Sequence, residues 1–573
     1  MTNIKPNPES KFLNQIKMLK SSSKETVIHT NTFTPFNKYM HTKRPIEDKI
    51  IKAVKCLEQQ DEKQLILLCG SVGDGKSHLL SYLKSALKSA YPSLFLNVFV
   101  HNDATVSHNP TESSIETLEK ILQGFNDGHT PTQHIIVAIN IGVLHNFYIS
   151  QKEKGQFAQL RQFINENGVF DENSLFTDSN SDKNKRFQLY NFASERVFAL
   201  TPNGPQSAFL ESIFTKIVQD DCDNPIYQAW KQDVEAGILT IAHANYQLLQ
   251  NEEIRVRVLE KIYHVILREK IMLSTRAFYN FIFTIIVPSE LEVNSNKTGF
   301  SIEHTLPNLL FNHPERSSLL EKICIIDPLQ IRVKEIDVLI SNLHVLSEKQ
   351  VFVQKIFNEC KVDWQSDIFR NVIQQAIEKN QLQELSKFII RMKDLTEPTV
   401  YKTFLDFVKY LYSFHTGDKK MIGELFAILK EAFIKWKGSP LPNYYFVSND
   451  LSRPHRLAFP LKLKEYVQKS FGAQESDEVI LQFDNYITLG FCKSVFNLDL
   501  RLYELLLKVK GGYRPNKNEM NVAIQFEDFY KQLLSSVEKS SEEVMIVRSV
   551  DKSKYLITKP SFGSVKFEVE KVR

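Results

Sequence analysis

The chain has 573 residues, which is too long for one ordinary domain and predicts about three or four domains. Apolar residues make up 42% of the chain, which is enough to bury several cores, and charged residues make up 24%, as in an ordinary soluble protein. The formal net charge of +4 is too small to indicate nucleic-acid binding by itself, and it leaves a local basic groove open.

The cysteines and the apolar segments of the chain indicate the cellular compartment of the protein. The six cysteines are spread along the chain without a Cys-x-x-Cys pair, which argues against a zinc site or a disulfide framework. The N-terminal residues lack the apolar core of a signal peptide, and no stretch reaches the roughly 18–20 apolar residues of a membrane-spanning helix. We therefore expect a cytoplasmic protein with no membrane partner.

The first part of the chain alternates between strand and helix patterns. Residues 1–40 are polar and weakly patterned, and we expect a loosely held N-terminal arm with at most one helix. After a helix that begins near Pro45, the expected elements are a strand at 64–69, a helix at 77–87, a strand at 94–100, a helix at 113–122 and strands at 134–139 and 187–191. This order is typical of an α/β domain with a parallel sheet, which we place at residues 41–220. Within it, the polar stretch 171–185 reads as a surface loop.

The remainder of the chain reads mainly as helix. Apolar residues recur at helical spacing in the expected lid at 221–290 and in a large helical domain at 291–540. The clearest helical stretches are 207–218, 252–269 and 275–286, followed by apolar stripes at 382–392, 404–411 and 502–509. The last residues, 541–573, change to three short strand patterns separated by turns. We expect a small antiparallel β-sheet there.

One motif is specific. Residues 70–77 read Gly-Ser-Val-Gly-Asp-Gly-Lys-Ser and match the phosphate-loop pattern G-x-x-x-x-G-K-[ST] at every position. Glycines let the backbone curl so that its amides point at phosphate oxygens, and the helix that follows adds its positive N-terminal end. The pattern predicts ATP bound with Mg²⁺ in a P-loop NTPase domain, with Lys76 reaching the phosphates and the Ser77 hydroxyl ligating the metal. The predicted nucleotide-binding set is Gly70, Ser71, Val72, Gly73, Asp74, Gly75, Lys76 and Ser77.

The acid that hydrolysis needs is not where the pattern places it. A P-loop hydrolase carries an acidic residue near the metal and the attacking water, at the end of another strand. The third expected strand ends in Asn140, where an aspartate is expected, and Ile141 follows where a catalytic glutamate often stands. Asn140 can orient a metal-bound water but brings no charge. Either another acid substitutes, with Asp103 after the second strand as the nearest candidate, or the site binds ATP and hydrolyses it slowly. Asp103 also fits an ordinary turn or helix cap.

Two more positions fit an AAA+-like site. Asn191 ends the fourth expected strand, where a polar residue can sense the γ-phosphate, although it also fits a loop cap. Arg276 begins a helix of the expected lid and could reach the γ-phosphate, although it also fits a surface salt bridge.

Several segments together carry a family resemblance. They are 41–48 (HTKRPIED), 68–80 (LCGSVGDGKSHLL), 101–105 (HNDAT), 138–144 (AINIGVL) and 273–278 (LSTRAF), in that order along the chain. They resemble the DptF family of DNA phosphorothioation-dependent restriction systems. The resemblance covers roughly residues 15–290, and the helical remainder is compatible with it. It implies an ATP-binding F subunit that works with G and H subunits against DNA lacking the sulfur mark, and that reaches DNA through this complex. The resemblance also implies that Asn140 belongs to the family pattern.

The remaining expectations concern chemistry and partners. The sequence shows no nuclease constellation, so cutting is assigned to a partner. Basic loops at 508–517 and 453–464 could contact DNA phosphates, or be ordinary solvated loops. Three functions stay open: an ATP-hydrolysing restriction subunit, a non-hydrolysing scaffold subunit stabilised by ATP, and a stand-alone signalling P-loop ATPase. An oligomer stays open as well.

Overall fold

A computed structural model describes most of the chain. The described residues are 9–20, 34–90, 97–102, 113–170, 186–192, 196–293, 300–330, 334–345, 351, 353, 355, 358, 367–396, 402–447, 453–468, 471–472, 478–558 and 567–572. The expected loop at 171–185 and the candidate acid Asp103 lie outside them. The chain forms two compact units. Unit 1 comprises Met1–Phe198 and Ser207–Val400, and unit 2 comprises Ala199–Gln206 and Tyr401–Arg573.

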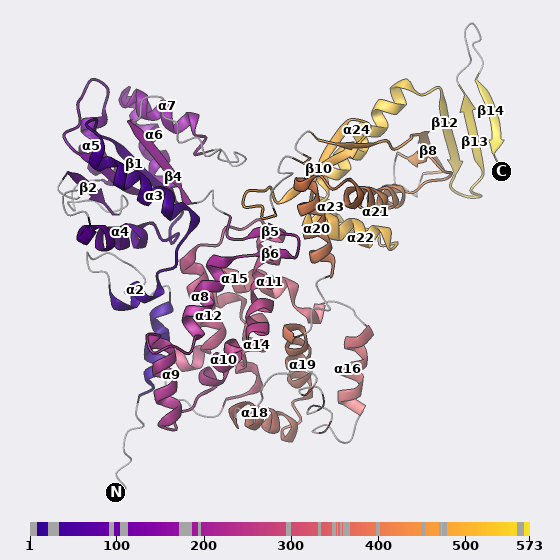
Figure 1. Ribbon diagram of the computed structural model, residues 1–573. Helices are drawn as coiled ribbons and strands as arrows, with labels where there is room; N and C mark the ends of the chain where they lie inside the picture. Colours follow the sequence, from indigo (N-terminus) through magenta and orange to yellow (C-terminus); the bar gives the residue numbers. More distant parts are fainter. Residues whose placement is uncertain are drawn as a thin grey trace. The chain divides into compact units, whose positions relative to one another are not determined.

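Unit 1 contains a parallel sheet of four strands in the order β2-β3-β1-β4. Three of them, β1, β2 and β4, are labelled in Figure 1. The strands are β1 (Leu65–Gly70), β2 (Val98–His101), β3 (His134–Asn140) and β4 (Phe187–Asn191). Every residue of β1 is buried, as expected for a strand covered on both faces. The sequence prediction of a parallel sheet is therefore confirmed.

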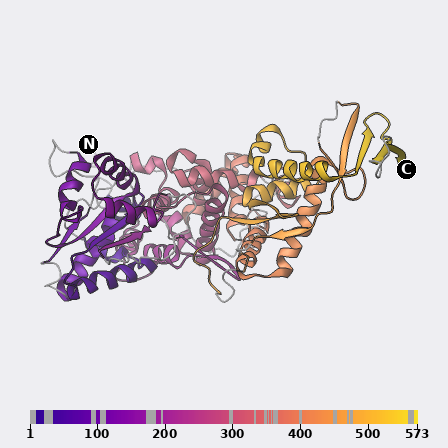
Figure 2. The same cartoon turned by 90° about the horizontal axis from the view of Figure 1, so that it is seen from above.

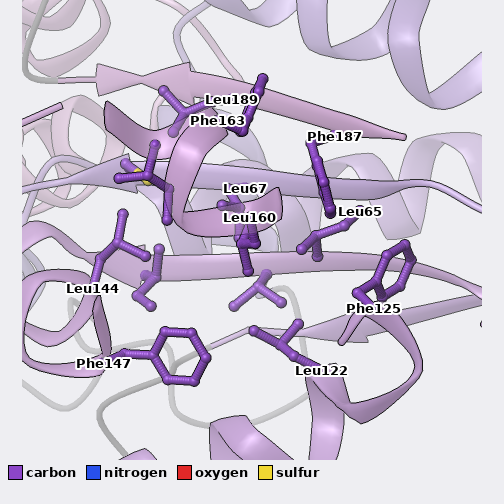
Figure 3. Packing of buried hydrophobic residues seen from close by; sticks show 14 of the residues in the cluster. Leu65, Leu67, Leu122, Phe125, Leu144, Phe147, Leu160, Phe163, Phe187 and Leu189 are labelled. Carbon is purple, nitrogen blue, oxygen red and sulfur yellow. The ribbon is translucent and has the colours of Figure 1, made fainter. Parts of the chain in front are cut away.

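Helices cover both faces of this sheet. Alternate residues of β1 point to opposite faces, so Leu65 and Leu67 pack on one side, and Ile66 and Leu68 on the other. The first side is covered by α5 (Ser114–Leu122), α6 (Ile141–Lys154) and α7 (Ala158–Glu166), whose leucines and phenylalanines fill the cluster in Figure 3. The second side is covered by α3 (Pro45–Cys56) and α4 (Lys76–Ala90).

The N-terminal segment is packed rather than loosely held. It forms α1 (Lys11–Ile16) and α2 (Pro35–Met40), and Phe12, Leu13 and Ile16 are fully buried. The expectation of a loose arm is thus wrong for its described parts. Apolar residues at helical spacing were the signal for α1, but their number is small because the helix has only 6 residues.

The rest of unit 1 is helical, as expected. Its helices are α8 (Ala208–Val218), α9 (Pro225–Glu235), α10 (Ile241–Gln250), α11 (Glu252–Glu269), α12 (Thr275–Ile286), α13 (Ser289–Val293), α14 (Leu306–Asn312), α15 (Ser318–Ile323), α16 (Lys334–Val345), α18 (Asp367–Glu378) and α19 (Leu382–Thr396). The expected helices at 252–269 and 275–286 are confirmed to the residue. A buried ion pair between Lys261 and Asp394 joins α11 to α19.

Unit 2 combines helices with two antiparallel sheets. Its helices are α20 (Lys402–Thr416), α21 (Lys419–Lys437), α22 (Leu500–Lys510), α23 (Lys517–Val522) and α24 (Ile524–Ser540). A two-stranded hairpin, β5 (Ala199–Thr201) and β6 (Gly204–Gln206), also belongs to this unit. One sheet has the order β11-β10-β9, built from β9 (Glu465–Val467), β10 (Tyr486–Phe491) and β11 (Ser494–Asp499).

The second sheet has the order β14-β13-β12-β8-β7. Its strands are β7 (Tyr444–Phe446), β8 (His455–Pro460), β12 (Glu543–Arg548), β13 (Lys554–Thr558) and β14 (Glu568–Val572). Within unit 2, β12, β13 and β14 extend past the helices (Figures 1 and 2). The expected C-terminal antiparallel sheet is confirmed, and it also contains two strands from earlier in the chain, β7 and β8.

The reading of residues 300–540 as mainly helical did not include the five strands that lie between 444 and 499. The signal was present in β10, where Ile487, Leu489 and Phe491 alternate with other residues and are fully buried. Short strands of this kind carry few such repeats. Among the described helices, none is both long enough and apolar enough to cross a membrane.

Candidate functional site

The glycine-rich segment 70–77 links β1 to α4 in unit 1. β1 ends at Gly70 and α4 begins at Lys76. Gly73 and Gly75 have φ values of +88° and +89°, which residues with side chains rarely adopt. A Cβ on Gly73 would lie 3.0 Å from the Cβ of Arg276 and 3.1 Å from the Ser274 hydroxyl. The loop therefore packs against the start of α12 only because this position is a glycine.

Two charged side chains fold back onto the loop. The Lys76 ammonium donates to the carbonyl of Ser71 at 2.6 Å, and the Asp74 carboxylate accepts from the Ser71 amide at 2.5 Å. Burial raises the pKa of the Asp74 carboxyl, and the neighbouring Lys76 charge opposes this rise. The backbone of Gly73 also accepts from the Arg276 amide at 3.2 Å, which ties the loop to α12.

A cavity of about 210 Å³ opens over the loop, where the carboxyl ends of the strands meet. Its lining includes the predicted residues Val72, Gly73, Gly75, Lys76, Ser77, Asn140 and Arg276. The other described members of the predicted set, Gly70, Ser71, Asp74 and Asn191, do not line it. Asn191 is buried at the end of β4, beside Cys69 in the sheet register. The structure therefore brings together residues far apart in sequence, from the loop, from β3 and from α12.

The strand end that is hydrogen-bonded to the Ser77 hydroxyl is not the one expected from the sequence. The Asn140 side-chain oxygen accepts from the Gly142 amide at 2.8 Å and so caps α6. The Ser77 hydroxyl instead donates to the backbone carbonyl of Asn102 at 3.0 Å, at the end of β2. The side-chain oxygen of Asn102 is buried without a hydrogen-bond partner, and Asn102 lines the cavity. The same residue therefore offers its backbone carbonyl to the Ser77 hydroxyl and carries a side-chain oxygen that no hydrogen bond uses.

The N-terminal segment contributes residues that sequence reasoning missed. The cavity lining includes Met18, Leu19, Phe36, Met40, His41, Arg44 and Glu47. Arg44 donates to the Thr275 hydroxyl at the start of α12. No spacing rule connects residue 44 to the loop, so only its presence in the segment 41–48, quoted above for the family resemblance, could have singled it out.

A histidine pair lies beside the loop. His41 and His78 are joined by a hydrogen bond of 3.2 Å between Nδ1 and Nε2, and His41 Nε2 lies 3.3 Å from the Glu47 carboxylate. The ring of Tyr82 stacks on His41 with 3.5 Å between centroids. Burial lowers the pKa of His78 to about 4, so its imidazole is neutral at neutral pH. These contacts fix the segment before α3 against α4.

A second anchor holds the same segment to α8. The Lys216 ammonium donates to the backbone carbonyls of Tyr39 and His41, at 2.7 Å and 2.6 Å. Burial lowers the pKa of this ammonium. The residues that line the cavity between 36 and 47 are therefore positioned by both α4 and α8.

Several charged or polar side chains of the two basic loops of unit 2 have partners within the chain. Lys510 lies 3.6 Å from Glu431, and the Tyr513 hydroxyl donates to Glu519 at 2.6 Å. Arg456 stacks on the ring of Phe446 at 3.5 Å. These pairings are those of ordinary surface loops, and they weaken the case for a DNA contact there.

Comparison with known proteins leaves the site to be judged on its own geometry. No family model matches the chain, and no curated protein matches it. The site combines a helix N-terminus, three cationic side chains (Arg44, Lys76 and Arg276) and a serine hydroxyl around one cavity. Such a set favours an anion, and among the described residues that line the cavity Ser77 and Asn102 carry oxygen atoms that could hold a cation beside it.

Proposed function

We propose that the chain binds ATP with Mg²⁺ through a P-loop at residues 70–77, as a subunit of a phosphorothioation-dependent DNA restriction complex. The observation that carries the nucleotide part is the loop itself, with two left-handed glycines leading into α4 and with Lys76 and Ser77 facing the cavity. The restriction part is supported by the ordered segments that resemble the DptF family. These include 41–48 and 273–278, which meet at the cavity through Arg44 and Thr275.

The chemistry of the lining supports a phosphate group. The first amides of a helix have no intrahelical acceptor and carry a positive dipole end, which together attract an anion. α4 begins at Lys76, beneath the cavity, and Arg276 stands at the start of α12 on its other side. The positive end of the α4 dipole and the Arg276 side chain would both be stabilised by the negative charge of a phosphate chain.

The cavity lining also contains oxygen atoms of the kind that bind Mg²⁺. Mg²⁺ prefers oxygen ligands, and Ser77 and Asn102, which both line the cavity, are joined by a hydrogen bond from the Ser77 hydroxyl to the Asn102 backbone carbonyl, while the Asn102 side-chain oxygen has no hydrogen-bond partner. When bound, Mg²⁺ neutralises phosphate charge and favours transfer of the terminal phosphoryl group. The residues proposed to hold it are Ser77, directly, and Asn102, directly or through water.

This arrangement changes the role we propose for Asn140. Its side-chain oxygen caps α6, so its NH₂ group is the part that would meet a phosphate oxygen. The metal side of the site is then the end of β2, where Asp103 follows Asn102 in the sequence. We keep Asp103 as the proposed acid on this sequence position alone.

One observation favours the alternative of a non-hydrolysing scaffold subunit. Among the described residues that line the cavity, Glu47 is the only carboxylate, and it lies against His41 rather than near Ser77. If Asp103 does not serve as the acid, ATP would stay bound and stiffen unit 1, and chemistry would belong to the partner subunits.

The test is ATP binding and turnover by the purified chain. Lys76→Ala removes the ammonium at the loop and is expected to weaken ATP affinity by about 100-fold, because hydrogen bonds to a charged phosphate are worth about 1.5–3 kcal/mol each. Isothermal titration calorimetry with MgATP measures the effect. Lys84→Ala, which removes an exposed lysine of the same helix outside the cavity, is expected to bind as the wild type does.

The outcomes separate the functions. A wild-type chain that binds no ATP would refute the proposed function. Turnover that Lys76→Ala and Asp103→Asn both abolish, while Asp103→Asn still binds ATP, supports the hydrolysing subunit. Tight binding without turnover, alone or with unmodified DNA and the G and H subunits, supports the scaffold.

A further inference from the structure

Arg44 stands directly over the turn at which α4 begins. It is the N-cap residue of α3, and its guanidinium lines the cavity. Its Nη2 atom lies 3.9 Å from the point that a Cβ on Gly75 would occupy. The amides from Gly75 onward are those that the helix N-terminus offers to an anion. The guanidinium is therefore close to the place where a phosphate would be bound.

Three separate parts of unit 1 hold this guanidinium. The Arg44 Cζ lies 4.4 Å from the ring centroid of Phe209 in α8 and 5.7 Å from that of Phe192, which follows β4. Its Nη2 donates to the hydroxyl of Thr275 in α12. Cation–π contacts and a hydrogen bond of this kind fix a long side chain before a ligand arrives, which lowers the entropy cost of binding.

The charge around Arg44 also favours an anion. Lys76 and Arg276 line the same cavity, so three positive side chains converge on one loop. Two described carboxylates lie near this group: Asp74, which accepts from the Ser71 amide and feels the charges of Lys76 and Arg44, and Glu47, which lies against His41, so the positive side chains outnumber them. Like charges brought together disfavour one another, and an anion with several negative charges relieves this repulsion.

We propose that Arg44 contacts the phosphate chain of the bound nucleotide and supplies, within the same chain, a positive charge at its α- and β-phosphates. This inference rests on the proposed nucleotide-binding function. In a P-loop the backbone amides cradle the α- and β-phosphates, whereas the lysine reaches the β- and γ-phosphates. Arg44 lies beside Gly75, on the side of the backbone amides, so its contact is shared by ATP and ADP.

The expected signature is a loss common to both nucleotides. Arg44→Ala should weaken MgATP and MgADP binding by about 10- to 100-fold each, leaving the ratio of the two affinities within about threefold of the wild-type ratio. Removing an ion pair should also make the affinity less sensitive to salt. A purely structural role for Arg44 would lower the melting temperature without changing this salt dependence.

The matched control is Arg186→Ala. Arg186 belongs to the same unit, stacks on Phe125 and Phe187 at 5.7 Å and 5.8 Å, and does not line the cavity. We expect it to lose thermal stability while binding both nucleotides normally. Arg44→Lys keeps the charge without the planar fork and should bind with intermediate affinity. It provides the decisive measurement if Arg44→Ala fails to fold.

The inference would be overturned if folded Arg44→Ala, or folded Arg44→Lys in its place, bound ATP and ADP as tightly as the wild type with the same salt dependence. It would also be overturned if only ATP, and not ADP, lost affinity. A wild-type chain that binds neither nucleotide refutes the proposed function itself. Normal wild-type binding with unaffected Arg44 variants refutes only the role of Arg44.

Discussion

His78 follows Lys76 and Ser77 on α4, and its half-buried imidazole stacks on and is hydrogen-bonded to His41 of the segment before α3. Burial lowers its pKa to about 4, and the positive charges of His41, Arg44 and Lys216 add to this effect in that order. The unfolded value is near 6.5. Between these two values the unfolded chain binds a proton that the folded chain does not. The free energy of unfolding therefore falls as the pH falls through this window.

We predict that His78→Gln makes folding less sensitive to acid. The wild type should lose on the order of 2–3 kcal/mol through His78 alone between about pH 7 and about pH 4. His243 and His415 are also buried with pKa values lowered to about 4, so the variant should retain part of the loss. Denaturant unfolding at both pH values measures the difference. The exposed His129→Gln is the control, and a His78→Gln variant with the wild-type pH dependence would contradict the prediction.

At the scale of single elements, α1 shows how a short helix is stabilised from outside itself. It has 6 residues, too few for a helix to persist in water alone. Asp233 of α9 accepts hydrogen bonds from the Ser10 hydroxyl at 2.6 Å and from the amides of Lys11 and Phe12 at 3.1 Å and 3.0 Å. The carboxylate thus binds the N-terminus of α1, where a negative charge is favoured.

We predict that Asp233→Asn releases α1. Replacing the buried carboxylate should cost about 2–3 kcal/mol, because hydrogen bonds to a charged group are lost. Since α1 leads to Met18 and Leu19 in the cavity lining, nucleotide affinity should fall as well.

Hydrogen exchange over residues 11–19, with and without MgATP, measures this release. Asp418→Asn is the control, because Asp418 is an exposed N-cap residue that accepts from the amides of Lys420 and Met421 at the start of its own helix, α21. Unchanged exchange in residues 11–19 would show that Asp233 does not hold α1.

At the scale of the whole molecule, the chain leaves unit 1 after Phe198, forms the β5–β6 hairpin of unit 2 and re-enters unit 1 at Ser207. In unit 2, Leu200 is fully buried and exchanges two backbone hydrogen bonds with Ile480, of 3.0 Å and 2.9 Å. In unit 1, the Ser207 hydroxyl donates to the carbonyl of Val197 and accepts from the Leu210 amide. It therefore joins the segment that leaves unit 1 to the segment that re-enters it, and it caps α8.

We predict that Leu200→Ala destabilises unit 2 while leaving the nucleotide site intact. Emptying a fully buried leucine site costs about 2–5 kcal/mol. Hydrogen exchange should show faster opening of α20 and β10, with β1 and α4 unchanged and MgATP affinity preserved. Leu210→Ala in α8, equally buried, should show the reverse pattern. A loss of protection in β1 and α4 after Leu200→Ala would contradict the division into two units.

The sequence by itself determined the features that depend on neighbouring residues. The loop at 70–77, the buried strand before it and the helices at 252–269 and 275–286 follow from local spacing. A helix repeats its buried face every three to four residues and a strand every two, so a short stretch of sequence is enough to recognise either. The same reasoning found the C-terminal sheet but not β10, whose alternation is short.

Only the tertiary structure decided which distant residues share the site. The Ser77 hydroxyl donates to Asn102, which follows β2, while the Asn140 side-chain oxygen caps α6, and packing on α8 and α12 brings Arg44 close to Gly75. Both outcomes depend on contacts between residues tens to hundreds of positions apart, such as the hydrogen bond from Arg44 to Thr275. Such contacts are selected by the burial of whole faces of the sheet and helices, and no local pattern encodes them.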